Sequence, residues 1–166
     1  DLGGSASVSI DRLAFKDNGD GTVAVTMSES YPMQLAFPED DDGPESIRLT
    51  VSQPGLVITA GGSATETSYD FAAPTSSVTL DEIIDQDGQK LDTQVEMTLS
   101  DLAAKYLVVR NGEEAQLDSS FTAASLAVNV AGKDKEGTGG GTLTLSVADL
   151  KGATKGNFPG AEIMAN

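Results

Sequence analysis

The stretch LAFKDNGDGTVAVTM, residues 13–27, carries the pattern that decides the fold. Apolar residues alternate with small or polar ones on either side of a loop rich in Asn, Asp and Gly. Loop residues of this kind tolerate the positive φ angles of tight turns, and strict alternation places apolar side chains on one face of a strand. The stretch therefore predicts a β-hairpin, with Leu13 and Phe15 in the first strand and Val23, Val25 and Met27 in the second.

The same alternation recurs on both sides of this hairpin. Val8 and Ile10 precede it out of phase with Leu13, which indicates one bulged strand or two short strands. Turn residues separate nearly all of the later candidate strands. These carry Met33, Leu35 and Phe37; Ile47, Leu49 and Val51; Leu56 and Ile58; Tyr69 and Phe71; Val78 and Leu80; Val95, Met97 and Leu99; Leu126, Val128 and Val130; and Leu143, Leu145 and Val147.

The fold predicted from this pattern is all-β, with little helix. The connections are too short for helical crossovers, so we expect an antiparallel meander of about ten or more strands. It would form a curved, elongated sheet, a sandwich or an open barrel. Residues 99–107 also show helical spacing of apolar residues, but Tyr106-Leu107-Val108-Val109 is typical of a strand, which we favour.

The second half of the chain contains a repeated pattern. The segments YDFAA, from Tyr69, and FTAA, from Phe121, are each followed by two alternating runs and an Asp-Leu pair before a Lys. A repeat of this kind predicts a sheet that grows by the addition of hairpins.

The charge of the chain excludes several classes of partner. It has 26 acidic and 10 basic residues, for a net charge of −16. Such a surface repels phosphate backbones and anionic headgroups, so we expect no nucleic-acid binding and no attraction to anionic membranes. No apolar run approaches the ~20 residues that span a bilayer, so we expect no membrane span.

Length and composition predict a single β-rich domain over residues 1–166. Aromatic residues make up 5% of the chain and Trp is absent, so we expect an aliphatic core. The chain opens at Asp1 without an initiator Met or a signal peptide. We therefore expect a mature form, or a fragment, of a longer exported protein.

The sequence offers little for catalysis. It has no His and no Cys, which excludes Ser-His-Asp and Cys-His catalysis and metal sites built on imidazole or thiolate. The S-x-x-K and G-x-S-x-G patterns are missing too. We expect no enzymatic activity and no cofactor. A carboxylate-based hydrolase is the remaining alternative, because 26 acidic residues always allow some carboxylate pair.

Three acidic loops match calcium-binding sequences only in part. DNGDGT, residues 17–22, would need Lys16 and Met27 as ligands, and IDQDGQ, residues 84–89, would need Ile83. We therefore expect turns at both places and no metal site. EDDDGPE, residues 39–45, is either a solvated loop or a weak calcium binder. Its candidate ligands are Asp40, Asp41 and Asp42.

Several segments together resemble a known family. They are LAFKDNGDGTVAVTM, the QPGL of residues 53–56, SYDFAA and the repeated Asp-Leu endings. On these segments the chain resembles the exported, β-rich alphaproteobacterial proteins of domain-of-unknown-function family 2125. The resemblance implies a repetitive antiparallel sheet and a periplasmic or extracellular location. It implies no activity and no catalytic residues.

An apolar face on the later strands is the candidate binding site. A sheet with one apolar face must cover it, and with few helical segments to serve as a lid the sheet must curl. We expect a non-catalytic cell-envelope module that binds a lipid-like ligand or an envelope protein partner there. The alternative is a structural subunit of a surface layer, filament or envelope complex, with strand edges paired between copies; the oligomeric state is open. The face consists of Val95, Met97, Leu99, Leu143, Leu145 and Val147.

Overall fold

The computed structural model describes residues 4–38, 43–112, 114–133 and 138–159, and within them it has ten β-strands and no helix. None of these residues therefore belongs to a helix long and apolar enough to cross a membrane. All neighbouring strands are antiparallel, which confirms the all-β prediction. The strands are β1 (Ser5–Val8), β2 (Leu13–Asp17), β3 (Thr22–Met27), β4 (Ser30–Ala36), β5 (Ser46–Ser52), β6 (Val57–Gly62), β7 (Glu66–Ile84), β8 (Thr93–Asn111), β9 (Glu114–Lys133) and β10 (Gly140–Pro159).

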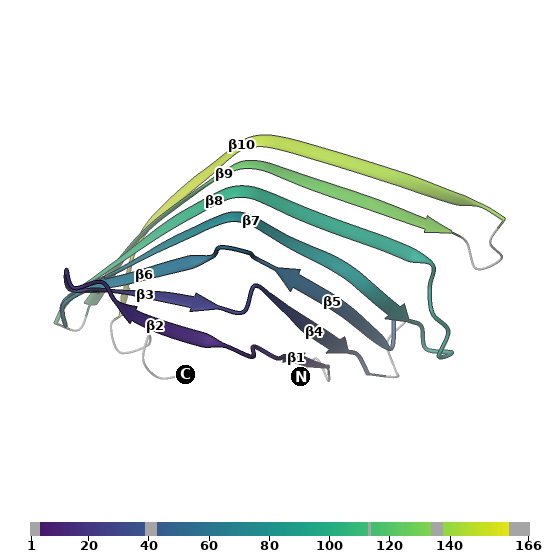
Figure 1. Ribbon diagram of the computed structural model, residues 1–166, viewed down its shortest axis with the longest axis horizontal. Coiled ribbons are helices and arrows are strands. Elements are labelled where there is room, and N and C mark those ends of the chain that lie inside the picture. The colour runs from purple at the N-terminus through teal and green to yellow at the C-terminus, as the bar shows by residue number, and fades with distance from the viewer. Residues whose placement is uncertain (1–3, 39–42, 113, 134–137, 160–166) are drawn as a thin grey trace.

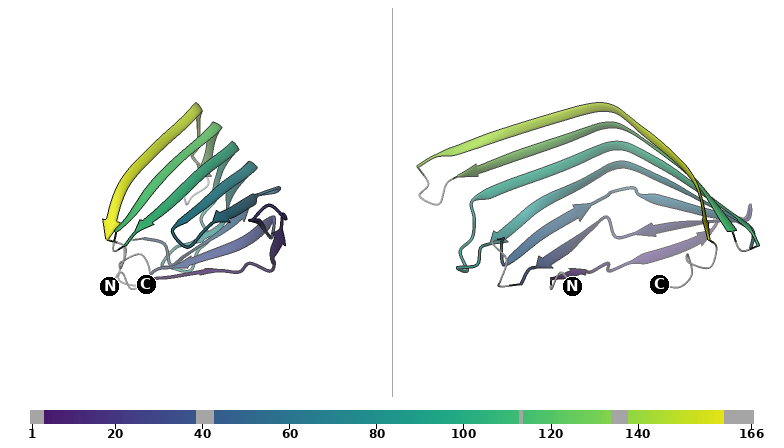
Figure 2. Two further views of the ribbon diagram at one scale, coloured as in Figure 1. Left: turned by 90° about the vertical axis from the view of Figure 1, so that its left-hand side faces the viewer. Right: turned by 180° about the vertical axis from the view of Figure 1, so that it is seen from behind.

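Four long strands, β7 to β10, form the body of a curled sheet with the shape of a half-barrel (Figures 1 and 2). One edge of β7 pairs with β8 along most of its length. The other edge pairs with two short strands in succession, because residues 67–72 meet β6 and residues 77–84 meet β5. Beyond β6 lie β3 and β2, and beyond β5 lie β4 and β1.

The sheet therefore has two halves, each seven strands across, that share the four long strands. We call one the aromatic half; it contains β2, β3 and β6 with residues 66–73, 102–111, 114–123 and 150–159. We call the other the aliphatic half; it contains β1, β4 and β5 with residues 75–84, 93–100, 125–133 and 140–148.

A bend crosses the four long strands at one level and separates the halves (Figure 1). By the register of the flanking pairs, Pro74, Asp101, Ala124 and Asp149 lie opposite one another at this level. Proline has no N–H to donate to the ladder. Asp101 and Asp149 have φ angles of 50° and 55°, a left-handed conformation that Asp adopts more readily than most residues. The Asp-Leu pairs of the sequence repeat are thus the bend residues of β8 and β10.

The structure corrects one expectation from the sequence and decides between two alternatives for another segment. The separate strands expected at Tyr69–Phe71 and at Val78–Leu80 are one strand, β7, since Pro74 bends the chain without ending it. Val8 lies in β1 and Leu13 in β2, so this segment forms two short strands and not one bulged strand. Residues 99–107, which also had helical spacing, lie within β8, as favoured.

The apolar faces of the two halves lie on the same side of the sheet. Phe71 and Val78 both belong to apolar cross-strand rows, yet strict alternation along β7 would put them on opposite faces. The side chain of Gln53 indicates that the two rows nevertheless lie on one side, because it contacts a residue on the face of each row. The Gln53 Nε2 donates to the Tyr31 hydroxyl at 3.0 Å, on the side of Val78, and lies 3.1 Å from the Met27 sulfur, on the side of Phe71. At the bend, the in-and-out alternation of side chains therefore shifts by one residue, which places the apolar faces of both halves on the same side of the sheet.

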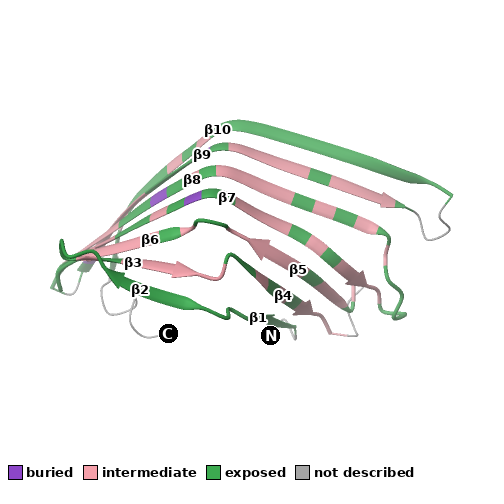
Figure 3. Ribbon diagram, in the orientation of Figure 1, coloured by how far each residue is buried: buried purple, intermediate pink, exposed green. Residues whose placement is uncertain are grey.

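Alanines near the bend show which side of the sheet is concave. Ala73, Ala104 and Ala123, on the apolar side, are 2%, 9% and 4% exposed. Their neighbours Ala72, Ala103 and Ala124 are all exposed. Figure 3 shows buried segments on the long strands near the bend, beside exposed ones. Because the side chain is the same in each case, its surroundings make the difference. The apolar side is the inner, concave side of the bend.

The aliphatic core expected from composition does not form among the described residues. The residues buried there are four alanines, Ala73, Ala104, Ala115 and Ala123, all in the aromatic half. The accessible surface of the chain is 11157 Å². A compact monomer of 17.0 kDa would expose about 7,700 Å², so the chain exceeds that value by roughly 45%. A single curled layer has no second layer to bury its apolar face.

Candidate functional site

Three apolar rows cross the concave side of the aliphatic half. We call them the aliphatic rows: Val95, Val130 and Leu143; Met97, Val128 and Leu145; Leu99, Leu126 and Val147. All six residues of the candidate face lie in these rows, on β8 and β10. The strand between them, β9, supplies the middle member of each row. The register thus brings the six residues onto one face.

The face is larger than the sequence indicated. The three β9 members have the same alternation as their neighbours, which is the signal that could have included them. The middle row also continues through Val78 and Val51 to Tyr31. The face therefore extends over β10, β9, β8, β7, β5 and β4.

The aliphatic rows are open to solvent, most of all on the outermost strand. Leu143, Leu145 and Val147 on β10 are 63%, 51% and 40% exposed. The β8 and β9 members are half-buried, because they have a neighbouring strand on each side. Nothing in the described structure covers the rows from above.

In the aromatic half, rings lie over small residues of the same concave side, while the rings themselves are partly exposed. Phe71, Ala104, Phe121 and Gly152 form one cross-strand row in which rings alternate with the smallest residues. The Phe71 and Tyr106 rings meet edge to face, with centroids 5.5 Å apart and an interplanar angle of 76°. The Phe121 ring lies over Gly152, where any Cβ would collide with it. These rings shield the backbone and alanines beneath them.

Charge is segregated to the outer face and the loops. The ion pairs Asp70–Lys105, at 3.7 Å, and Asp118–Lys155, at 3.2 Å, join neighbouring strands on the outer face of the aromatic half. Arg48 and Lys90 both pair with Glu82 on the outer face of the aliphatic half. On the concave side of the described strands, the charged residues are Asp17 and Arg110, both at the far end of the aromatic half. The aliphatic rows contain no charge.

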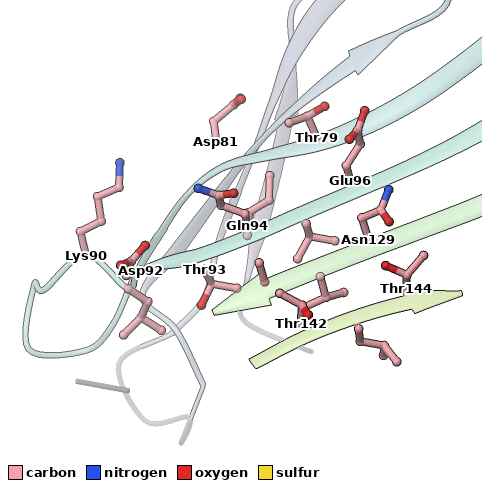
Figure 4. A pocket seen from close by; sticks show the side chains of 16 residues that line it. Thr79, Asp81, Lys90, Asp92, Thr93, Gln94, Glu96, Asn129, Thr142 and Thr144 are labelled. Carbon is pink, nitrogen blue, oxygen red and sulfur yellow. The ribbon is translucent and has the colours of Figure 1, made fainter. Parts of the chain in front are cut away.

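A hollow of about 860 Å³ lies at the end of the aliphatic half, lined by residues of β7, β8, β9 and β10 and of the loop before β8 (Figure 4). Thr79, Glu96, Asn129 and Thr144 form a polar row there, between the apolar rows in register and therefore on the opposite side of the sheet. Two of the charged groups near it have partners, since Asp81 accepts a hydrogen bond from the Thr50 hydroxyl at 2.7 Å and Lys90 lies 3.5 Å from Glu82. The lining also includes the first aliphatic row, Val95, Val130 and Leu143, so the hollow borders the candidate face.

The loop of residues 17–22 is a turn, as predicted. Asp17 accepts a hydrogen bond from the Gly19 N–H at 2.8 Å. Asp20 accepts from the Thr22 hydroxyl at 2.6 Å and from the Thr22 N–H at 3.0 Å. These bonds, that of the hydroxyl first, hold the pKa of Asp20 below its ordinary value. Both carboxylates are thus occupied in shaping the turn.

The loop of residues 84–89 is a turn as well. Asp85 accepts hydrogen bonds from the N–H groups of Asp87 and Gln89, at 3.1 and 2.8 Å, and Gly88 has a φ angle of 73°. Within the described residues, no three His, Cys, Asp or Glu side chains gather as metal ligands would. Asp40, Asp41 and Asp42 lie outside the described residues, so weak calcium binding there stays a prediction.

The candidate site is therefore an open, uncharged apolar face with a charged outer face behind it. Comparisons of the chain with protein-family models, with curated proteins and with solved structures find no match, and the family resemblance seen in the sequence stays a prediction.

Proposed function

We propose that the protein is a non-catalytic binding module that holds a lipid-like molecule against the aliphatic rows. The observation that carries the proposal is the exposure of those rows. Leu143 and Leu145 are more than half exposed at the edge of a continuous, uncharged apolar surface. Contiguous apolar surface of this kind is rare on monomers and is typical of binding sites.

The energetics favour a long apolar ligand. Each methylene group transferred from water to an apolar surface contributes about 0.8 kcal/mol, so ten of them offset much of the ordering cost of binding. From Val95 to Leu99 the three rows extend over about 14 Å along the strand, at ~3.4 Å per residue. One leaflet of a bilayer's ~30 Å hydrocarbon core is about as deep, so the rows match the length of an acyl chain.

The aliphatic half suits such a ligand better than the aromatic half does. In the aromatic half, rings cover the small residues of the same row, although rings such as Phe121 are exposed themselves, and that side also carries the charged residues Asp17 and Arg110. The aliphatic rows have no such cover. A charged headgroup would remain at the margin, because the rows offer no polar partner and burial of an unpaired charge is costly.

The proposal includes a location in the periplasm or outside the cell. The family resemblance supports this location. A protein partner with an apolar strand or loop is the alternative occupant of the same rows.

Uptake of the apolar dye N-phenyl-1-naphthylamine tests the proposal, together with native mass spectrometry for co-purified lipid. We expect Leu145→Glu to weaken dye binding by more than tenfold, because it places a carboxylate in the middle aliphatic row. The matched control is Ser146→Glu, which adds the same charge one residue away on the outer face and should leave dye binding unchanged.

Circular dichroism and urea unfolding must show that both variants remain folded. The proposal fails if the wild-type protein takes up no dye and carries no lipid. It also fails if Ser146→Glu and Leu145→Glu weaken dye binding equally, because the rows would then have no special role.

A further inference from the structure

The outermost long strand, β10, presents an unusual edge. Among the described strands it pairs with β9 alone, so one side of its 20 residues has no ladder partner. Natural proteins commonly protect such edges with charged side chains, especially Lys. Residues 140–148 of β10 carry no charged side chain at all, and Leu143 and Leu145 are exposed there. The other edge is interrupted between β1 and β2 and includes Lys16 and Asp17.

The topology decides how a second copy could continue this sheet. Each half is seven antiparallel strands across, an odd number, so its two outer strands run in the same direction. With both concave sides facing the same way, β10 beside β1 or β2 of a second copy would make a parallel ladder. A two-fold axis normal to the sheet instead places β10 beside β10 in antiparallel pairing, like every ladder in the chain.

We propose that two copies of this chain pair through β10 about a two-fold axis at the bend. Matching the bends of the two strands places Asp149 opposite Leu150 of the second copy. The bend line and the concave sides then continue across the interface. In this register the aliphatic half of one β10 meets the aromatic half of the other, with Thr144 opposite Lys155 and Ala148 opposite Lys151.

The charges on β10 fit this pairing. A chain of net charge −16 repels its own copies in general, so a self-contact needs a locally favourable surface. Each of the two lysines of β10 meets an uncharged residue of the second copy, and no like charges stand directly opposite. All four positions lie on the outer face by alternation, which keeps the lysine side chains in solvent.

Pairing along β10 uses its backbone edge and leaves the concave side of β8 and β9 as it is. It adds a neighbouring strand beside Leu143 and Leu145, so it lowers their exposure but does not lie over the aliphatic rows. The dimer and the ligand site therefore adjoin each other and need separate measurements.

Two charge variants distinguish the effect of charges in this proposed register from the effect of the overall net charge on dimerisation. Thr144→Lys with Ala148→Lys makes the chain less negative, from −16 to −14, which weakens general repulsion between copies. It also sets lysines opposite Lys155 and Lys151 of the second copy. Thr144→Glu with Ala148→Glu makes the chain more negative, at −18, which strengthens general repulsion. It also sets carboxylates opposite the same lysines. Sedimentation velocity should show a wild-type dimer at tens of micromolar, at least tenfold weaker dimerisation for the Lys variant, and an intact or tighter dimer for the Glu variant.

Ala14→Lys, on the outer face of the opposite edge strand β2, is the matched control and should leave the dimer intact. Circular dichroism shows whether each variant is folded. A monomeric wild-type protein would overturn the proposal, and so would a dimer weakened by the Glu variant and strengthened by the Lys variant. Dissociation by Ala14→Lys would place the contact at the wrong edge. Dye uptake, measured on the same samples, reports the ligand site separately, because all these substitutions lie on the outer face.

Discussion

The aromatic and aliphatic halves are built on the same four long strands, yet they treat their apolar sides differently. In the aromatic half, large rings alternate with Ala and Gly across a row, so a ring from one strand lies over its small neighbour. In the aliphatic half, each row is a series of Val, Leu and Met side chains of similar height. All four buried residues of the described structure are in the first half and none is in the second.

The difference shows how a single-layer sheet can bury anything at all. A side chain is buried when other side chains lie over it, and in a sheet without a second layer those must come from the same face. A ring over a small residue achieves this, as in the aromatic rescue of glycine at sheet edges. Branched aliphatic side chains standing side by side cover each other's flanks but leave their ends in water. The halves therefore divide the work: one stabilises the sheet, and the other offers an apolar surface.

The largest expected effect contrasts one residue from each half. Phe71→Ala removes the edge-to-face contact with Tyr106 and uncovers Ala104, so we expect the free energy of unfolding to fall by about 2–3 kcal/mol, less than for a fully buried Phe. Leu126→Ala, in an aliphatic row, should cost about 1 kcal/mol, because Leu126 is only half-buried and no ring lies over it. Urea unfolding of both variants checks this contrast. Equal losses would mean that the two halves are packed alike.

Two glycines of β10 provide a finer comparison. Gly152→Ala puts a methyl group against the Phe121 ring, and displacing the ring should cost about 1–2 kcal/mol. Gly141→Ala, in the aliphatic half, meets nothing within 4 Å and should change stability by less than about 0.5 kcal/mol.

A double-mutant cycle sharpens this prediction. In a Phe121→Ala background the Gly152→Ala substitution should lose its cost, because no ring remains to be displaced. If the cost persists there, the ring over Gly152 is not what distinguishes the aromatic half.

The bend that joins the halves should tolerate some residues and not others. Asp149 has a φ angle of 55°, which β-branched residues strongly disfavour. We expect Asp149→Val to lower the free energy of unfolding by about 1 kcal/mol, and Asp149→Gly to change it by less than about half that amount. Thermal unfolding of the two variants measures the difference. Equal tolerance of Val and Gly would show that the left-handed conformation does not hold the bend.

The smallest expected effect concerns the turn of residues 17–22, at the end of the aromatic half. Hydrogen bonds from Thr22 lower the pKa of Asp20 from its ordinary value of 3.8. A lowered folded-state pKa means that this carboxylate stabilises the fold above pH 3.8, and that the contribution is lost as the pH falls through the lowered pKa. Carbon-detected NMR titration should find the Asp20 pKa below 3.8, and Thr22→Val should raise it by removing the hydroxyl donor. A Thr22→Val variant with an unchanged Asp20 pKa would contradict this assignment.

Alternation in the sequence predicted much of the fold and of the candidate site. The hairpin of β2 and β3 was predicted with the residues that share its apolar face, and the six candidate residues on β8 and β10 do share one face. Alternation succeeds here because a strand has a period of two, so neighbouring residues reveal which side chains point together. The sequence repeat also marked Asp101 and Asp149, although it did not reveal that they bend the strands.

The continuous course of β7 was not predicted, and the reason is local ambiguity. Pro74 between two alternating runs is the pattern of a turn between two strands. Only the pairing of residues on both sides of Pro74 with the single strand β8 shows that the chain continues. The shift of alternation at the bend was not predicted either. Counting odd and even residues along a strand assumes that the backbone stays extended, and it does not reveal a bend that crosses four strands.

What the sequence by itself determined is the β-structure, the turns and the residues that share a face within each strand, because these depend on near neighbours. Only the tertiary structure decided which strands pair, that one bend crosses four of them, and that the two apolar faces meet on one concave side. These features depend on hydrogen bonds between residues far apart in the chain. The aliphatic core expected from composition failed for the same reason: composition counts apolar residues, whereas burial requires a second surface, and a single curled sheet supplies one only where a ring lies over a small residue.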